Sequence, residues 1–295
     1  MKVCVLGSGG LLGHMLIRIL SGSHDVHGTT REKASKDSPL ARFLPLEKWI
    51  GEVDATEPRS IKSVFEKKQF DVVINCIGLI KQRSDQVDDR LMMSINGEFP
   101  HQLAEFANSS GARVIQISTD CVFSGNKGNY VETDTPDPVD TYGRSKLLGE
   151  LNDSTNLTIR TSHIGPELGR HTSFFDWVLG SENQTVNGYV GAIYSGFSTL
   201  VSAQLIEALL QRVDLYGNVW HLASKPISKF ELIEMINSVF DLKIQLVEDR
   251  QYTCDRSLKM DSLNSRLEFT APTWKAMIEA MHLDQRNYQH RSGVS

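Results

Sequence analysis

The sequence predicts an α/β fold in which a parallel sheet carries helices on both faces, followed by a smaller and less regular C-terminal lobe. Up to about residue 165, short apolar runs typical of buried strands alternate with stretches that have the spacing of amphipathic helices. This alternation favours βαβ units, whose strands lie parallel and whose helices cover the sheet. Beyond residue 165 the alternation loosens, which indicates a different organisation of the chain.

The apolar runs and helical patterns define the expected elements in order. Residues 71–76, Asp-Val-Val-Ile-Asn-Cys, form the clearest buried strand, and residues 11–20 repeat apolar side chains at the spacing of one helix face. Residues 31–48 are polar and contain two prolines, so we expect a surface connection there. Strands are also expected at 2–6, 25–29, 112–118 and 157–161, with one ending near 53, and helices at 61–68, 92–108 and around residue 142.

The second part of the chain has fewer clear signals. We expect helices at 205–210, 229–240 and 274–281, and a strand at 219–223 that returns to the main sheet. Residues 1–165 are therefore expected to form one domain, and residues 166–295 mainly a second lobe.

Composition excludes several classes of protein. The net charge of −5 argues against a general binder of nucleic acid or of anionic membranes. Four scattered cysteines without a Cys-x-x-Cys pair indicate neither a disulfide framework nor a zinc site. No apolar run approaches the roughly 18 residues that span a membrane. We therefore expect a cytoplasmic protein.

A glycine-rich segment follows the first strand and opens the first helix. Gly7 allows a tight turn, Gly10 lets the backbone approach a pyrophosphate, and Gly13 allows the helix to pack closely on the sheet. Leu11 and Leu12 are part of the same expected site. In this context the glycines predict a Rossmann-type dinucleotide-binding turn, and the alternative is a glycine-rich loop without a function.

The end of the second strand indicates which dinucleotide binds. An acidic residue there holds the ribose hydroxyls of NAD, whereas an arginine suits the 2′-phosphate of NADP. The stretch His27-Gly-Thr-Thr-Arg31 has the arginine and no acid. We expect NADP(H) to be preferred, with NAD(H) as the alternative and a plain surface charge as the other interpretation of Arg31.

Residues that end the third and fourth strands extend this site. Asp54 and Ala55 follow the third strand, and Asp54 either binds the adenine amine or caps a helix. Cys76, Ile77 and Gly78 come where the fourth strand leaves the sheet, and Gly78 lets the nicotinamide ribose pass close to the backbone.

Tyr142 and Lys146 lie one helical turn apart, so the phenol and the ammonium share a helix face. A fixed cation there favours the phenolate and lets the tyrosine exchange a proton with a substrate oxygen near neutral pH. The spacing alone is common, and a solvated helix face is the plain alternative.

A hydroxyl at the end of the fifth strand completes the expected chemistry. Open α/β sheets bind ligands at the carboxyl ends of their strands, where Ser118 and Thr119 stand. We assign the hydroxyl that orients a substrate carbonyl to Thr119, with Ser118 as the alternative. Thr119, Tyr142 and Lys146 together predict hydride transfer to or from a carbonyl.

These motifs resemble those of the extended short-chain dehydrogenase/reductase family, in particular its dTDP-4-dehydrorhamnose reductase branch. The resemblance is strong up to residue 165 and can be followed to about residue 282. The matching segments are residues 7–13, Asp54-Ala-Thr56, Ile95-Asn-Gly97, Ser118-Thr-Asp-Cys-Val-Phe-Ser-Gly125, Tyr142-Gly-Arg-Ser-Lys146 and Arg160-Thr-Ser162.

The resemblance implies NADPH-dependent reduction of the 4-keto group of a nucleotide-linked 4-keto-6-deoxy sugar, in the biosynthesis of deoxysugars for surface polysaccharide. Tyr142 would be the general acid, Thr119 would orient the carbonyl, and Lys146 would tune the pKa of the tyrosine and contact the ribose. The expected partner is a small anionic nucleotide sugar, and a homodimer is a further expectation.

Two positions depart from the pattern of the branch. His163 stands where an aromatic residue is usual, and His14 stands where some members have a metal-binding glutamate, so we expect no required metal. For substrate contacts we expect Lys81 with its neighbour Gln82, Asp120 and His163, although surface or packing roles explain each of them equally well.

Other activities are compatible with parts of the pattern. A 4,6-dehydratase of this family would be expected to have glutamate after Asp120, and this chain has Cys121, which disfavours dehydration. An epimerase would keep the tyrosine and lysine and stays open. A non-catalytic NADP-binding subunit also stays open, because the regulatory subunit of eukaryotic methionine adenosyltransferase resembles the same branch.

Overall fold

The computed structural model describes residues 1–80, 88–169 and 171–288. The strands are β1 (Lys2–Leu6), β2 (Asp25–Thr29), β3 (Trp49–Ile50), β4 (Val72–Asn75), β5 (Arg113–Thr119), β6 (Leu157–Thr161), β7 (His163–Ile164), β8 (Thr185–Tyr194), β9 (Phe197–Ser198), β10 (Asn218–Leu222), β11 (Ile227–Ser228) and β12 (Gln245–Asp255). The helices are α1 (Gly13–Leu20), α2 (Pro58–Lys67), α3 (Asp89–Met93), α4 (Phe99–Ser109), α5 (Thr141–Leu148), α6 (Phe174–Leu179), α7 (Thr199–Leu209), α8 (Lys229–Phe240), α9 (Asp261–Leu267) and α10 (Trp274–Asp284).

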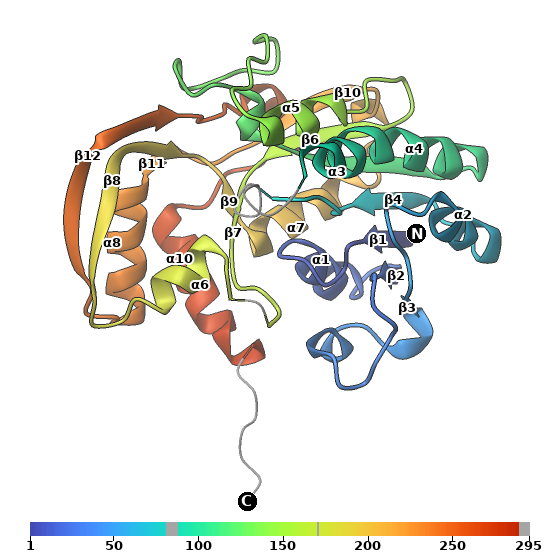
Figure 1. The fold of residues 1–295 in the computed structure, drawn as a ribbon, viewed down its shortest axis with the longest axis horizontal. Helices are drawn as coiled ribbons and strands as arrows, with labels where there is room; N and C mark the ends of the chain where they lie inside the picture. The colour runs from blue at the N-terminus through green and yellow to red at the C-terminus, as the bar shows by residue number, and fades with distance from the viewer. Residues whose placement is uncertain (81–87, 170, 289–295) are drawn as a thin grey trace, which may run out of the picture.

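Seven strands in the described part of the chain form one parallel sheet in the order β10-β6-β5-β4-β1-β2-β3. The direction of winding reverses beside β1, because β2 lies on one side of it and β4 on the other. Loops at the carboxyl ends of neighbouring strands diverge at such a point and leave room for a ligand. In Figure 1 these ends point toward the lobe that contains β8, β11 and β12.

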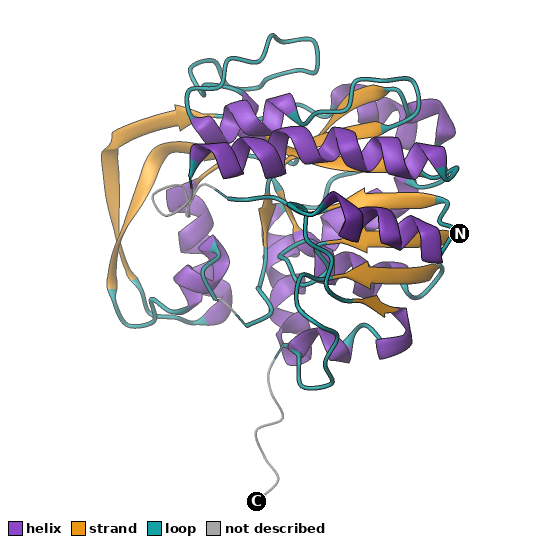
Figure 2. Ribbon diagram, turned by 45° about the vertical axis from the view of Figure 1, so that its right-hand side comes forward, coloured by secondary structure: helices purple, strands orange, loops and turns teal. Residues whose placement is uncertain are grey.

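Alternate residues of each strand face opposite layers of helices, as the pleat of a strand requires. On β1, Val3 and Val5 belong to the cluster of buried residues that includes α1 and α7, whereas Cys4 and Leu6 belong to the cluster that includes α2 and α4. Figure 2 shows helices on both faces of the sheet. The predicted α/β class with a doubly wound parallel sheet is therefore confirmed.

The C-terminal lobe contains a small sheet in the order β11-β8-β12, together with α6, α8 and α10. Two elements from this half of the chain return to the main sheet: β10 pairs with β6, and α7 packs against α1. Buried residues from β1 through α10 form one continuous cluster, so the two parts of the molecule share a core.

The structure differs from the expected elements at several points. The third strand ends at Ile50, before Glu52, whose φ of 60° is incompatible with a continuing strand. The segment 31–48 is not wholly at the surface, because Leu40 and Leu44 are buried. The long helix expected at 92–108 contains a π-helical turn at Ser94–Glu98 between α3 and α4. None of the helices in the described ranges has both the length and the apolarity to cross a membrane.

Candidate active site

The glycine turn between β1 and α1 is tightly packed. Gly7 has a φ of 74°, and a Cβ there would lie 3.2 Å from the backbone carbonyl of Cys76 at the end of β4. A Cβ on Gly13 would lie 2.2 Å from the carbonyl oxygen of Gly7. Leu11 and Leu12 precede the first residue of α1, where backbone amides lack helical acceptors and favour a phosphate. The turn is therefore as tight as the sequence predicts, and its binding of a pyrophosphate stays a prediction.

Helix α5 carries Tyr142 to the carboxyl end of β5. Asp140 caps the helix by accepting a hydrogen bond from the amide of Gly143 at 2.8 Å. The absence of a side chain at Gly143 allows close contact with the turn after β5, because a Cβ there would lie 2.2 Å from the carbonyl oxygen of Cys121. This contact brings the phenol of Tyr142 within hydrogen-bonding reach of the Thr119 hydroxyl.

Lys146 occupies the space between α5 and the ends of β4 and β5. Its ammonium donates a hydrogen bond to the carbonyl oxygen of Ile117 at 2.6 Å, and its side chain is buried. A Cβ on Gly78 would lie 3.8 Å from the Lys146 Nζ, so the lysine lies directly beside the loop expected to carry the nicotinamide ribose.

Burial sets the protonation of both groups. It raises the pKa of Tyr142, and only the hydrogen bond with Thr119 opposes this among the leading influences. It lowers the pKa of Lys146 to about 8. Burial therefore dominates the pKa of the phenol and favours its protonated form, as a proton donor requires, and the charge of Lys146 is not among the leading influences on this pKa. The tuning of the tyrosine by Lys146 stays a prediction.

Asn96 positions the loop after β4. Its amide oxygen accepts a hydrogen bond from the Leu79 amide at 2.8 Å, and its amide nitrogen donates to the Leu79 carbonyl at 3.0 Å and to the Ser145 hydroxyl at 3.1 Å. The π-helical turn brings this side chain to the loop, and Gly149 allows the close approach of α5. Asn96 thus braces the loop backbone beside Gly78.

Ser118, the alternative to Thr119, has a different environment. Its hydroxyl donates to a Glu150 carboxylate oxygen at 2.7 Å, and Glu150 forms a bidentate ion pair with Arg160 at 2.8 Å. Successive residues of a strand point to opposite faces, so Ser118 points away from Tyr142 when Thr119 points toward it. The geometry favours Thr119 as the hydroxyl beside the tyrosine.

Asp120 and His163 lie next to this site. The Asp120 carboxylate accepts hydrogen bonds from the Thr119 hydroxyl at 3.1 Å and from the Ser162 hydroxyl at 2.6 Å. His163 Nδ1 lies 3.0 Å from the Ser202 hydroxyl, and its buried Nε2 has no hydrogen-bond partner within the described residues. Burial, with a smaller effect of Lys146, lowers the pKa of His163 to about 4, so the imidazole is neutral.

Arg31 and Asp54 lie near each other at the other end of the expected cofactor site. The Arg31 side chain is 68% exposed, and its nearest carboxylate partner, Glu32, is 3.9 Å away. Hydrogen bonds from the Thr56 amide and hydroxyl lower the pKa of Asp54, and the charge of Arg31 adds to the effect. Asp54 therefore stabilises its own turn and does not cap α2, which begins at Pro58 after Glu57 and has no side-chain cap. It stands beside a cation available to a ligand.

Both ring nitrogens of His14 lie within hydrogen-bonding distance of other groups of the protein. Its Nδ1 lies 2.8 Å from the carbonyl oxygen of Gly10 and its Nε2 lies 2.9 Å from the hydroxyl of Tyr288. No group of three or more His, Cys, Asp or Glu side chains in the described ranges is arranged to hold a metal ion.

The structure gathers most of the predicted site residues at one edge of the sheet. Lys81 and Gln82 lie outside the described residues. Two nearby cations were not expected from the sequence: Lys229, whose pKa is affected by Asp120, and Arg256, which donates to the Phe123 carbonyl at 2.8 Å. Tertiary contacts of the C-terminal lobe bring these two side chains near the site. No sequence motif indicates that they lie there.

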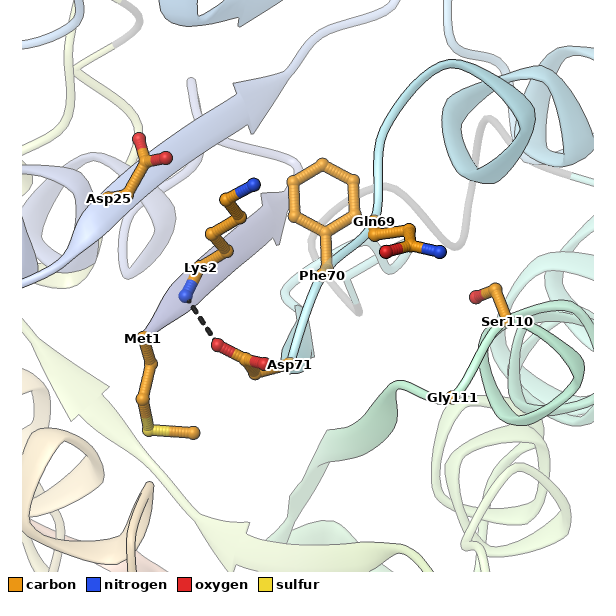
Figure 3. Close-up of a pocket in the computed structure, with 8 residues that line it drawn as sticks. All are labelled: Met1, Lys2, Asp25, Gln69, Phe70, Asp71, Ser110 and Gly111. Carbon is orange, nitrogen blue, oxygen red and sulfur yellow. Dashed lines mark hydrogen bonds between the residues drawn. The ribbon is translucent and has the colours of Figure 1, made fainter.

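A separate hollow lies at the opposite edge of the sheet (Figure 3). It is open, and Lys2, Asp25, Phe70, Asp71 and Gly111 are among its lining residues. These residues stand at the amino ends of β1, β2, β4 and β5, far from the catalytic candidates. We place the candidate site at the carboxyl edge of the sheet, because the phenol of Tyr142, the ammonium of Lys146 and the glycine turn lie there.

Several known proteins are similar to this chain in sequence. A probable low-salt glycan biosynthesis reductase, Agl14, of Haloferax volcanii is 33% identical over 153 residues, 51% of this chain and 48% of that protein. A dTDP-4-dehydrorhamnose reductase of Burkholderia thailandensis is 31% identical, over 58% of this chain and 53% of that protein. The chain thus matches about half the length of these two relatives. A dTDP-4-dehydrorhamnose reductase of Aggregatibacter actinomycetemcomitans is 26% identical over 76% of this chain and 74% of that protein.

Solved structures agree on the fold. A dTDP-4-dehydrorhamnose reductase of Clostridium acetobutylicum superposes with a TM-score of 0.79 at 21% identity, covering 97% of this chain and 100% of that one. A hypothetical dTDP-4-dehydrorhamnose reductase of Sulfolobus tokodaii has a TM-score of 0.75 at 28% identity, covering 92% and 96%.

The family model described as RmlD substrate binding domain matches residues 1–285. The match includes the glycine turn, the Tyr142 helix and the C-terminal lobe. The chain therefore belongs to the RmlD substrate binding domain family, within the extended short-chain dehydrogenases/reductases.

Proposed function

We propose that the protein is an NADPH-dependent reductase of the 4-keto group of a nucleotide-linked 4-keto-6-deoxy sugar. The observation that carries the proposal is the contact between Tyr142 and Thr119 at the carboxyl edge, with Lys146 beside Gly78. The family and the names of the relatives support the substrate class. Deoxysugar and surface-polysaccharide biosynthesis, a cytoplasmic location and a homodimer remain predictions that accompany this proposal.

Tyr142 acts as the general acid in this proposal. Because burial raises its pKa, the phenol keeps its proton until negative charge develops on the substrate oxygen, and it then donates the proton to that oxygen. Thr119 orients the same oxygen through its hydroxyl. Lys146, one helical turn from Tyr142, is held by the Ile117 carbonyl, and its positive charge would favour the phenolate that remains after proton transfer.

The residues of the expected cofactor site fit a dinucleotide. Cβ atoms at Gly7 and Gly13 would press on the backbone of Cys76 and of Gly7, so the glycines keep the turn tight enough for a pyrophosphate. A Cβ on Gly78 would lie 3.8 Å from the Lys146 Nζ, so this glycine leaves room beside the lysine. When bound, NADPH supplies a hydride to the carbonyl carbon. Cys76, Ile77, Asp54 and Ala55 line the expected path of this cofactor from the ribose to the adenine.

The residue that follows Asp120 favours reduction over dehydration. Burial raises the pKa of the Cys121 thiol to about 12, so the thiol stays protonated and does not replace the second carboxylate that dehydration requires. An epimerase and a non-catalytic NADP-binding subunit are the remaining alternatives.

Replacing Arg31 with alanine is expected to raise the KM for NADPH about tenfold or more and leave the KM for NADH unchanged, because a charge-assisted hydrogen bond to phosphate contributes about 1.5–3 kcal/mol. The weak pair with Glu32 leaves the guanidinium available. Lys62→Ala is a matched control, since Lys62 is also exposed and pairs weakly, with Glu66 at 3.6 Å. Loss of NADH use alone in Arg31→Ala would exclude the assignment.

The function itself is tested by NADPH oxidation in the presence of 4-keto-6-deoxy sugars linked to dTDP, UDP or GDP. We expect turnover with at least one of them and formation of the corresponding deoxysugar nucleotide. Conversion of a sugar nucleotide to its epimer without net NADPH consumption would indicate the epimerase. NADPH binding without turnover of any keto sugar would favour the non-catalytic subunit.

A further inference from the structure

Lys229 occupies an unusual position in the C-terminal lobe. It is the first residue of α8 and follows Ser228, which caps the helix. Its ammonium lies 4.0 Å from the ring centroid of Phe174 on α6 and 4.0 Å from that of Tyr194 on β8. The two aromatic rings therefore enclose a cation that comes from a third element.

This cation lies next to the catalytic edge. Tyr194 and Ser162 crowd the same glycine, because a Cβ on Gly196 would lie 2.4 Å from the Tyr194 hydroxyl and 2.2 Å from the Ser162 carbonyl oxygen. Ser162 in turn donates to Asp120 at 2.6 Å, and Asp120 accepts from Thr119 at 3.1 Å. A short series of contacts thus leads from the aromatic enclosure of Lys229 to the hydroxyl beside Tyr142.

The charge of Lys229 is only partly compensated. Burial lowers its pKa to about 8, and Asp120 opposes this shift through its negative charge. No direct ion pair joins Lys229 to Asp120, and within the described residues the ammonium donates no hydrogen bond. The two cation–π contacts stabilise the ammonium, but aromatic rings do not replace a hydrogen-bond acceptor. Lys229 is only partly buried, so its ammonium remains accessible to a hydrogen-bond acceptor that approaches the site from outside the protein.

We propose that Lys229 determines substrate specificity by donating a hydrogen bond to a hydroxyl of the hexose, and that Asp120 accepts a hydrogen bond at the same end of the sugar. This inference rests on the proposed function, since it assumes a sugar at the carboxyl edge. A hydroxyl group both accepts and donates, so it suits an ammonium next to a carboxylate. A diphosphate accepts only, and the charge of Asp120 would repel it.

Equilibrium binding separates the sugar contact from a diphosphate contact. The enzyme loaded with NADP⁺ is titrated by calorimetry with dTDP, UDP and GDP and with the 6-deoxyhexose derivative of each, and the pair that binds most tightly is then used. We expect Lys229→Met to weaken binding of the sugar nucleotide about tenfold and to leave binding of the free nucleoside diphosphate unchanged. Lys225→Met is the matched control, because Lys225 is exposed in the same segment.

Three results would overturn the inference. Equal weakening of the sugar nucleotide and the free diphosphate would place Lys229 at the diphosphate. Unchanged binding of both would leave a structural role. A wild-type protein that binds the sugar nucleotides no more tightly than the diphosphates would have no sugar contact to assign.

Melting curves with NADP⁺ would reveal whether Lys229→Met loses its fold. A second variant keeps the inference testable in that case. Asp120→Asn keeps the size of the side chain and weakens its acceptor strength, and we expect the same selective loss of affinity for the sugar nucleotide. Because these titrations require no turnover, a failure of NADPH oxidation contradicts the proposed reductase separately from the sugar contact.

Discussion

Replacing Tyr142 with phenylalanine is expected to lower kcat for NADPH-dependent ketone reduction by about 10²–10⁴-fold, because the general acid is lost while its ring is kept. The cap at Asp140 and the close contact of Gly143 with Cys121 are unaffected by the change, so helix α5 keeps its position. The loss should therefore fall on kcat, with little change in the affinity for NADPH. Initial rates and fluorescence titration of NADPH measure the two effects.

Tyr189→Phe is a suitable control, because Tyr189 is exposed on β8 of the C-terminal lobe. It should retain wild-type kcat. A Tyr142→Phe variant that retains more than about a tenth of the wild-type kcat would assign the proton donor to another group.

Replacing Arg160 with methionine is expected to destabilise the protein by about 3–5 kcal/mol, because it leaves the buried Glu150 carboxylate without its cation. Both side chains of the pair are only 6% exposed, and among the described residues the hydrogen bond from Ser118 is the one that remains to Glu150, with the charge of Lys146 nearby. For a chain of this size the melting temperature should fall by roughly 10 °C, at about 2–4 °C per kcal/mol. Calorimetry of the cofactor-free protein measures the shift.

A double variant distinguishes an uncompensated charge from a loss of packing. Removing both charges with Glu150→Met and Arg160→Met should recover most of the stability, because paired buried ions are often replaced by apolar groups at little cost. If the double variant is as unstable as the single one, the loss arises from packing and the electrostatic explanation is wrong.

The main sheet was predictable because its strands are buried on both faces. Such strands are short, continuous apolar runs, and β1, β4 and β5 lie within one or two residues of the expected ranges. The glycine turn was also predictable, since Gly7 and Gly13 meet steric demands that follow from any strand–turn–helix of this kind.

The long strands of the C-terminal lobe were not predictable in the same way. Strands β8 and β12 pair over much of their lengths, yet β12 is largely exposed and contains the charged run Glu248-Asp-Arg250. An exposed edge strand buries too little apolar surface to produce a clear pattern. Its conformation depends on pairing with β8, which only the folded chain provides.

Within the site, the sequence motifs identified which residue types are present. The environment of each side chain is determined by the folded structure. The expectation for Tyr142 and Lys146 followed from their spacing, whereas burial is what raises the pKa of the phenol. The alternation of β5 separates Thr119 from Ser118, a distinction that a pair of adjacent hydroxyl residues does not reveal in sequence. Lys229 was missed because α6, β8 and α8 meet around it only in three dimensions.

We propose that Tyr142, Thr119 and Lys146 together support reduction of a sugar ketone with NADPH. The most direct measurement uses NADPH deuterated at C4 of the nicotinamide and mass spectrometry of the product. We expect one deuterium at the former carbonyl carbon with the wild-type protein, and no labelled product above background with Tyr142→Phe. Conversion of the keto sugar to a product without deuterium, or equal labelling by the variant, would contradict it.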